Sequence, residues 1–317
     1  MAVAIQKNKQ SIMNKVIKLS AFFILSVFTA SAQIKEFTVN EEWVQKIRNA
    51  APENTEVTPS KIHNVLVFDL ITGYKHWDTP HIDEVLTVLG DKSGAFKVEV
   101  TSDIFKFEAK SLNNYDAVVL NNNCSVGPRR NMFLDQLDKD ESLSEAEKSK
   151  IATRLEANLI KYVKKGGGLA VIHGSITMQN NSMPFSEMVG GSFDYHPAQQ
   201  DVSLELVDAD HPLVKAFDGK AFVHRDEPYL FKNAYAQKNF RPLLYIDTSK
   251  LIKKKEIDEK IKYVSWIKSH GKGRVFYSSP SHNAQSFEDP KMLKFFLDGM
   301  QYVLGDLKCD DSPGGFK

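Results

Sequence analysis

The segment from Ser144 to His173 constrains the fold more than any other part of the chain. Ser144 and Glu147 have the spacing of a capping box, which predicts that a helix begins here. An apolar stripe runs along this helix, and Gly166 ends it. The stripe consists of Ile151, Leu155, Leu159, Tyr162 and Val163. The next residues, GLAVIH (168–173), form a continuous apolar run, which is typical of a strand buried on both faces. A long helix followed at once by a buried strand indicates an α/β fold.

Earlier segments show the same alternation of strand and helix. Apolar runs predict three more strands, at residues 64–70 (NVLVFDL), 96–103 (FKVEVTSD) and 115–123 (YDAVVLNNN). Between the first two, Pro80 opens a predicted helix. Its apolar face consists of Ile82, Val85, Leu86 and Leu89. We therefore expect a doubly wound, mostly parallel sheet with right-handed crossovers.

Beyond His173 the pattern becomes irregular, and we expect a β-rich insertion after the fourth strand. Residues 201–208 (DVSLELVD) alternate between apolar and polar side chains, as an edge strand should. Further strands are predicted at residues 241–247, 262–268 and 273–279, and a final helix at 290–304. The chain shows neither an internal repeat nor a low-complexity segment.

The predicted domain organisation has four parts. Residues 1–32 have the pattern of a secretory signal peptide, in which Lys15 and Lys18 precede a short apolar run and an Ala-Ser-Ala site. Residues 33–60 form an N-terminal extension with one short helix and a linker rich in proline and threonine. We expect a single domain over residues 61–308 and a C-terminal tail over 309–317.

Composition excludes some classes of function. The 41 basic and 40 acidic side chains leave no basic surface of the kind that binds nucleic acids. The apolar run in the signal segment is shorter than the roughly 20 residues that span a bilayer. The sequence therefore predicts an exported, soluble protein, periplasmic or extracellular. Its two cysteines, Cys124 and Cys309, are predicted to be unpaired, because a chain of this size does not need a disulfide.

Polar side chains follow several of the predicted strands. The run GGGLAVIHGS (166–175) resembles the approach to a nucleophile elbow, but it places His173 where a cysteine or serine would stand. His76 and Trp77 follow the first strand, Asn122 the third and His282 the last. Because the carboxyl ends of parallel strands meet at one edge of a sheet, we expect these side chains to lie close together.

The insertion adds further candidates for the same site, namely Tyr195, His196, Glu227 and Tyr229. Aromatic rings, amides, carboxylates and imidazoles together suit a small polyhydroxylated ligand. No short-spaced pair of metal ligands exists, so no cofactor is certain. A divalent metal would require the fold to gather its ligands from distant positions. The candidates are His76, His173, His196, Glu227 and His282.

Seven motifs, taken together and in this order, closely resemble the ThuA-like, trehalose-utilisation family over roughly residues 62–308. They are VLVF…TGYKHW, YDAVVLNN, YVKKGGGLAVIHG, MVGGSFDYHP, DADHPLVKAF, DEPY and GKGRVFYSSPSHNAQSFEDP. The resemblance implies a class I glutamine amidotransferase-like (flavodoxin-like) fold and a role in carbohydrate catabolism, with a link to 3-keto sugars. It also implies that the pocket contains His76, His173, His196, Glu227 and His282. Ser281 departs from the family, several members of which have glycine there.

The comparison also excludes one chemistry. Amidotransferases of this fold carry a cysteine at the strand corner, where this chain offers Ile172 or His173. Neither residue forms a thioester, so glutaminase activity is not expected.

The sequence therefore predicts an enzyme that acts on a sugar, keto-sugar or glycoside by acid/base chemistry. His173 and His282 are assigned the acid and base roles, with His76 as a further catalytic candidate. Trp77, Asn122, Tyr195, His196, Glu227 and Tyr229 are assigned to substrate binding. Three alternatives remain: a non-catalytic carbohydrate-binding protein, a metal-dependent hydrolase that uses the histidine cluster, and a structural partner in an envelope complex. The expected partner is a small carbohydrate, and the chain could form homo-oligomers.

Overall fold

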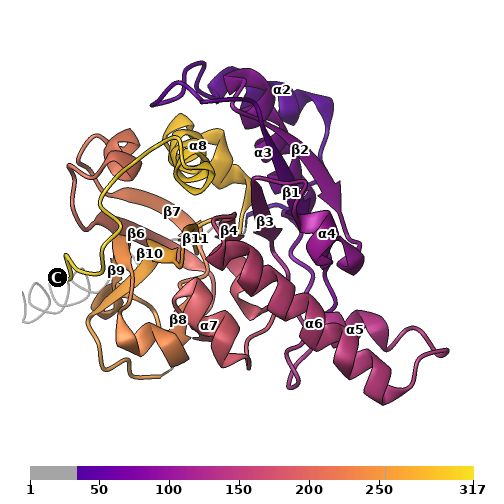
Figure 1. Ribbon diagram of the computed structural model, residues 1–317. Coiled ribbons are helices and arrows are strands. Elements are labelled where there is room, and N and C mark those ends of the chain that lie inside the picture. The colour runs from indigo at the N-terminus through magenta and orange to yellow at the C-terminus, as the bar shows by residue number, and fades with distance from the viewer. Residues whose placement is uncertain (1–33, 254) are drawn as a thin grey trace, which may run out of the picture. The chain divides into compact units, whose positions relative to one another are not determined.

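The central sheet combines a parallel half with an antiparallel half. In the computed structural model, which describes residues 34–253 and 255–317, nine strands pair in the order β2-β1-β3-β4-β11-β10-β9-β6-β7 (Figure 1). The parallel half consists of β1 (His63–Phe68), β2 (Phe96–Thr101), β3 (Ala117–Asn121), β4 (Gly168–Ile172) and β11 (Gly273–Ser278). Eight of the nine strands were predicted, and each predicted strand begins and ends within two residues of the observed one; β7 is the strand that was not predicted.

The antiparallel half follows β11 in the sheet. It consists of β10 (Ile261–His270), β9 (Arg241–Asp247), β6 (Gln200–Leu206) and β7 (Phe222–Asp226). The alternating strand predicted at 201–208 is β6, but it does not form the edge, because β7 pairs with its outer side. A separate two-stranded ribbon joins β5 (Ser192–Tyr195) to β8 (Leu230–Lys232).

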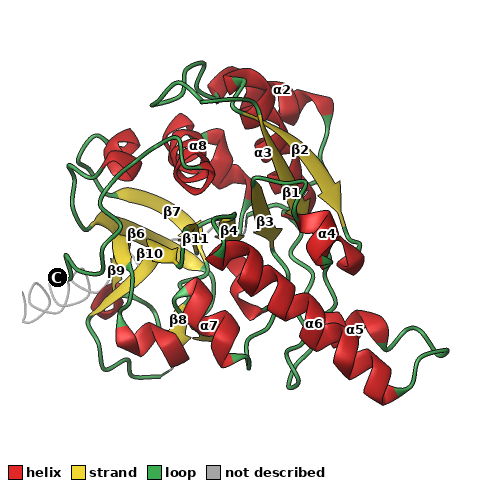
Figure 2. Cartoon of the chain, in the orientation of Figure 1, coloured by secondary structure: helices red, strands yellow, loops and turns green. Residues whose placement is uncertain are grey.

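Helices cover both faces of the sheet (Figure 2). One face carries α3 (Thr79–Ser93) and α8 (Pro290–Leu304), and the other carries α6 (Glu145–Lys164) and α7 (Met183–Val189). The shorter helices are α2 (Glu41–Ala50), α4 (Ala109–Leu112) and α5 (Met132–Leu137). The predicted capping box is present, because the side chains of Ser144 and Glu147 each accept a hydrogen bond from the backbone N–H of the other residue.

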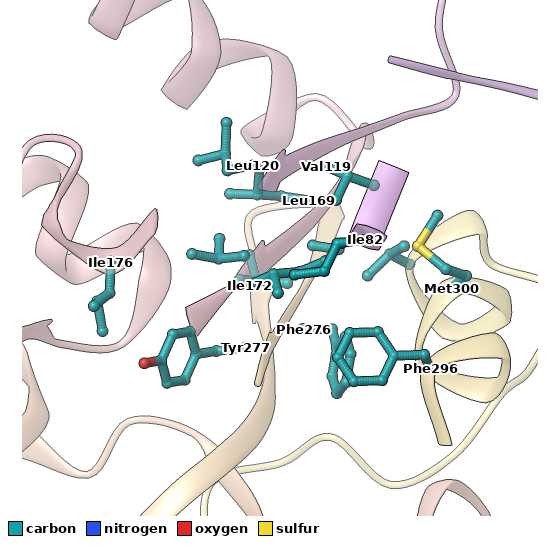
Figure 3. Close-up of a cluster of buried hydrophobic side chains, with 14 of the residues drawn as sticks. Ile82, Val119, Leu120, Leu169, Ile172, Ile176, Phe276, Tyr277, Phe296 and Met300 are labelled. Atoms are coloured by element: carbon teal, nitrogen blue, oxygen red, sulfur yellow. The ribbon is translucent and has the colours of Figure 1, made fainter. Parts of the chain in front are cut away.

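Buried apolar side chains fill the space between the sheet and its helices (Figure 3). On the face covered by α8, Phe276 of β11 packs against Phe296, with ring centroids 6.2 Å apart. β3 and β4 are buried along their whole length, which accounts for their continuous apolar sequences. This packing fixes the carboxyl ends of the parallel strands, from which the functional candidates project.

The parts of the chain outside the predicted domain also make contacts. Trp43 and Ile47 of α2 are buried, and Trp43 packs edge-on against His81 of α3. At the other end, the Lys317 backbone N–H donates to the Tyr263 hydroxyl at 2.7 Å. The predicted signal peptide lies outside the described residues. Among the helices that are described, none is long and apolar enough to cross a membrane.

Candidate active site

Three histidines that follow different parallel strands meet at one edge of the sheet. His76 follows β1, His173 follows β4 directly, and His282 lies four residues beyond β11. The ring centroid of His76 lies 4.9 Å from that of His173 and 5.3 Å from that of His282. The centroids of His173 and His282 are 5.2 Å apart. The structure therefore brings together the three histidines that the sequence assigned to catalysis.

His173 occupies a sharp corner between β4 and the turn that follows. Its φ of 44° lies in the left-handed region, which non-glycine residues rarely adopt. The next residue is Gly174, where a Cβ atom would lie 2.5 Å from Cε1 of His76. The corner thus holds the two imidazoles closer together than a larger residue at position 174 would allow.

Hydrogen bonding orients the ring of His173. Its Nδ1 lies 2.6 Å from the carbonyl oxygen of Ser279, so Nδ1 carries a proton and donates it to that oxygen. The side chain is fully buried, and the ring of Tyr229 lies against it with centroids 4.3 Å apart. In the neutral form the Nε2 atom then carries a lone pair that faces the centre of the cluster.

Glu227 joins the histidines from the insertion. Its Oε2 atom lies 3.3 Å from Nδ1 of His282, 3.5 Å from Nε2 of His173 and 3.6 Å from Nε2 of His196. Nε2 of His173 and Nδ1 of His282 are 3.2 Å apart. One carboxylate oxygen is therefore shared among three imidazoles.

Asp226, which the sequence analysis did not select, holds two of these segments together. Its carboxylate accepts the backbone N–H groups of Ser281 at 2.8 Å and of His282 at 3.3 Å. It also accepts the N–H of Glu227 at 2.7 Å. Because Asp226 is buried at the end of β7, it fixes the turn that carries His282 against the segment that carries Glu227. Its only signal in the sequence is its position beside Glu227.

Burial and mutual charge shift the pKa values of the cluster in opposite directions. Burial disfavours a charged His173, but the hydrogen bond to Glu227 and nearby carboxylates outweigh it and raise the pKa of His173. Burial acts against ionisation of Glu227, yet His173 and the other imidazoles lower the pKa of its carboxyl. Burial, together with the charge of His173, lowers the pKa of His282 and lowers that of His76 strongly. These shifts favour charge on His173 and Glu227 and disfavour charge on His282 and His76.

A cavity of about 220 Å³ adjoins the cluster. Its lining includes four of the predicted site residues, His76, His196, Glu227 and Tyr229, together with Tyr74, Cys124, Arg130, Thr177 and Phe193. The ring of His196 stacks on Tyr229 at 5.4 Å, and its side chain is about a third exposed. His173 and His282 do not belong to the lining, but both contact Glu227, which does.

Cys124 also borders the cavity but is not arranged as a nucleophile. Its thiol lies 3.6 Å from Nδ1 of His76 and donates to the carbonyl oxygen of Gly174 at 3.5 Å. Burial raises the pKa of this thiol to about 11, so it remains protonated near neutral pH. Cys124 and Cys309 are both free, as the sequence predicted.

Three predicted substrate-binding residues lie elsewhere. Asn122 is fully buried, where its amide donates to Asp78 and its oxygen accepts the N–H of Gly174 at 3.2 Å. Trp77 packs edge-on against His81 with centroids 5.1 Å apart, and Tyr195 lies under the ammonium of Lys255. None of the three lines the cavity, so Asn122 supports the corner at Gly174 rather than facing a ligand.

The sequence profile of one protein family matches the chain over residues 64–303, and that family is described as "ThuA: Trehalose utilisation". No curated protein matches the chain.

Several solved structures share the fold. A ThuA-like protein from Bacteroides uniformis has 18% sequence identity and a TM-score of 0.57, with 77% of this chain and 92% of that chain covered. A ThuA-like protein from Parabacteroides merdae has 16% identity and a TM-score of 0.53, covering 80% and 98%. A protein from Salmonella typhimurium, described as cytoplasmic, has 16% identity and a TM-score of 0.52, covering 76% and 99%. At these identities the likeness concerns the fold alone.

Proposed function

The chain belongs to the ThuA (trehalose utilisation) family, and we propose that it is an exported enzyme of carbohydrate catabolism that moves protons on a keto-sugar or keto-glycoside. The observation that carries this proposal is the cavity of about 220 Å³ beside a cluster of imidazoles and one carboxylate. A site with several buried, converging proton-transfer groups is typical of acid/base catalysis.

The substrate class follows from the groups that border the cavity. The exposed ring of Tyr74 beside the cavity can contact the C–H surface of a sugar ring, and Arg130 and Thr177 can hydrogen-bond hydroxyl groups. A carbonyl group in the sugar acidifies the protons on the neighbouring carbons. An imidazole can then remove such a proton, leaving an enediolate whose oxygen needs stabilisation.

The geometry supports a division of roles within the cluster. His76 and His196 line the cavity, so we assign the proton transfers with substrate to these two imidazoles. His173 and His282, to which the sequence analysis gave those roles, contact Glu227 but do not line the cavity. We assign to them the positioning of Glu227, and to Arg130, a cation that lines the cavity, the stabilisation of negative charge on the substrate oxygen. Isomerisation and β-elimination both begin with removal of a proton beside the carbonyl, and hydrolysis of a keto-glycoside results when water adds to the product of β-elimination.

A turnover screen against glycosides and their 3-keto forms tests the proposal. We expect turnover of a keto form, and a fall of at least about 100-fold in kcat/KM for His76→Ala, because general acid–base groups contribute roughly that much or more. His270→Asn is the matched control, since this imidazole lies at the opposite end of the sheet, paired with Gly273 where β11 begins.

Two results would contradict the assignment. Full activity of His76→Ala on the substrate found would exclude its catalytic role. Binding of keto-sugars with no turnover of any of them would instead make the protein a carbohydrate-binding module on this scaffold.

The proposal of export is supported by the basic, apolar and Ala-Ser-Ala pattern of residues 15–32. Intact-mass analysis of the protein made in a secreting host tests it. We expect a mature chain that begins at Gln33, and an uncleaved chain retained inside the cell would refute export.

A further inference from the structure

Glu227, which lines the cavity, and two histidines that contact it contribute three ligand-type atoms, and these form a triangle of the size found in metal sites. Its corners are Nε2 of His173, Nδ1 of His282 and Oε2 of Glu227, and its edges measure 3.2, 3.3 and 3.5 Å. Zinc binds imidazole nitrogen and carboxylate oxygen at about 2.0–2.2 Å, so tetrahedral angles place two such ligands about 3.3–3.5 Å apart. The observed edges fall in or next to this range.

The surroundings of the triangle hold the atoms in a form that can bind a metal. A histidine that ligates a metal usually donates its other ring N–H to a carbonyl or carboxylate, which fixes the tautomer. His173 makes such a bond, from Nδ1 to the carbonyl oxygen of Ser279 at 2.6 Å. The buried carboxylate of Asp226 binds the backbone N–H groups of both Glu227 and His282, so it positions two of the three corners.

A fourth group stands next to the triangle. One nitrogen of His76 lies within 4.8 Å of the ligand atoms of the other three residues. Glu227 and His76 border the cavity. This arrangement matches catalytic zinc sites, which have three protein ligands and keep one position for water or substrate.

We propose that His173, Glu227 and His282 form a binding site for one divalent transition-metal ion of the zinc type. Two nitrogen ligands and a single carboxylate favour zinc or a similar ion over calcium and magnesium, which prefer oxygen ligands throughout. The cavity supplies the open position, and His76 stands beside it as the proton-transfer group. This site extends the proposed function, because a metal ion bound there would polarise the substrate carbonyl. Only the identity of the substrate depends on the proposed function; the metal site itself is argued from geometry.

The test uses the full chain stripped with a chelator and then titrated with Zn²⁺ by calorimetry and with Co²⁺ by visible absorption. We expect one ion per chain and the d–d bands of four-coordinate Co²⁺ with nitrogen and oxygen ligands. Glu227→Gln is nearly isosteric but replaces the anionic ligand with a neutral amide. We expect it to weaken binding by more than the roughly 10- to 100-fold that loss of an outer-shell partner costs.

His270→Asn again serves as the control, and it should bind Co²⁺ as the wild type does. The proposal is overturned if the stripped wild type binds neither ion with a defined stoichiometry, or if Glu227→Gln binds as tightly. Should Glu227→Gln not fold, the stoichiometry of metal binding by the wild type still decides the question.

The two proposals can fail separately. Stoichiometric metal binding without turnover of any keto-sugar supports the metal site and contradicts the proposed function. Turnover that persists at full rate in protein shown by elemental analysis to be free of metal supports the function and overturns the metal site.

Discussion

The backbone of Ser281, the residue before His282, adopts a strained conformation. Its φ of 151° lies in a region that only glycine adopts readily, and its buried hydroxyl has no hydrogen-bond partner among the residues that the structure describes. Its backbone N–H donates to Asp226 at 2.8 Å, so the strained residue is held in the turn that precedes His282. The departure from glycine noted in the sequence therefore falls at a position where the backbone favours glycine.

We expect Ser281→Gly to stabilise the protein. Relief of a strained backbone contributes about 1–3 kcal/mol, against which the greater freedom of glycine in the unfolded chain costs about 0.5–1 kcal/mol. A net gain of about 1 kcal/mol in the free energy of unfolding should appear as a higher midpoint in urea denaturation. Ser265→Gly, at a buried position within β10, should instead destabilise. A lower midpoint for Ser281→Gly would show that the turn is not strained.

At the level of single residues, the sequence was informative where function depends on position along a strand. His76, His173 and His282 each follow a parallel strand, so their convergence could be predicted. Asp226 and Asp78 were not assigned to the site, because their importance comes from backbone N–H groups and amides that lie far away in sequence. Trp77 was assigned to the site because it adjoins His76, but its side chain packs against His81.

At the level of elements, prediction succeeded where burial leaves a simple pattern. β4 is buried at every position and α6 carries an apolar stripe behind a capping box, so both could be identified within a residue or two. β7 was not identified, because only its last residue is buried and Val223 is exposed. A short edge strand of this kind lacks the alternation that distinguishes strands from loops.

The omission of β7 matters for function. Each antiparallel pairing from β11 through β10, β9 and β6 to β7 reverses the strand direction, so β7 runs in the same direction as the parallel strands. Its carboxyl end carries Asp226 and is followed by Glu227. The carboxylate that completes the cluster thus comes from an element that only the folded sheet reveals.

For the molecule as a whole, the same edge of the sheet holds several carboxyl groups away from water. Asp83 of α3 accepts a hydrogen bond from the Asn121 amide at 2.8 Å. Burial raises the pKa of its carboxyl to about 7, with smaller contributions from the negative charges of Asp69 and Glu84. The folded protein therefore retains a proton on Asp83 at pH values where the unfolded chain has released it.

This raised pKa gives the stability of the whole molecule a pH dependence of definite sign. Between about pH 4 and pH 7 the folded state binds more protons at Asp83 than the unfolded state, so its contribution to stability falls as pH rises, by up to about 1.4 kcal/mol per pH unit. In Asp83→Asn the side-chain oxygen can still accept the hydrogen bond from the Asn121 amide, but the side chain cannot ionise. Urea denaturation of both proteins at about pH 5 and about pH 8 should show the variant gaining stability relative to the wild type at the higher pH. An unchanged difference between the two pH values would mean that the Asp83 carboxyl ionises as readily in the folded protein as in the unfolded chain.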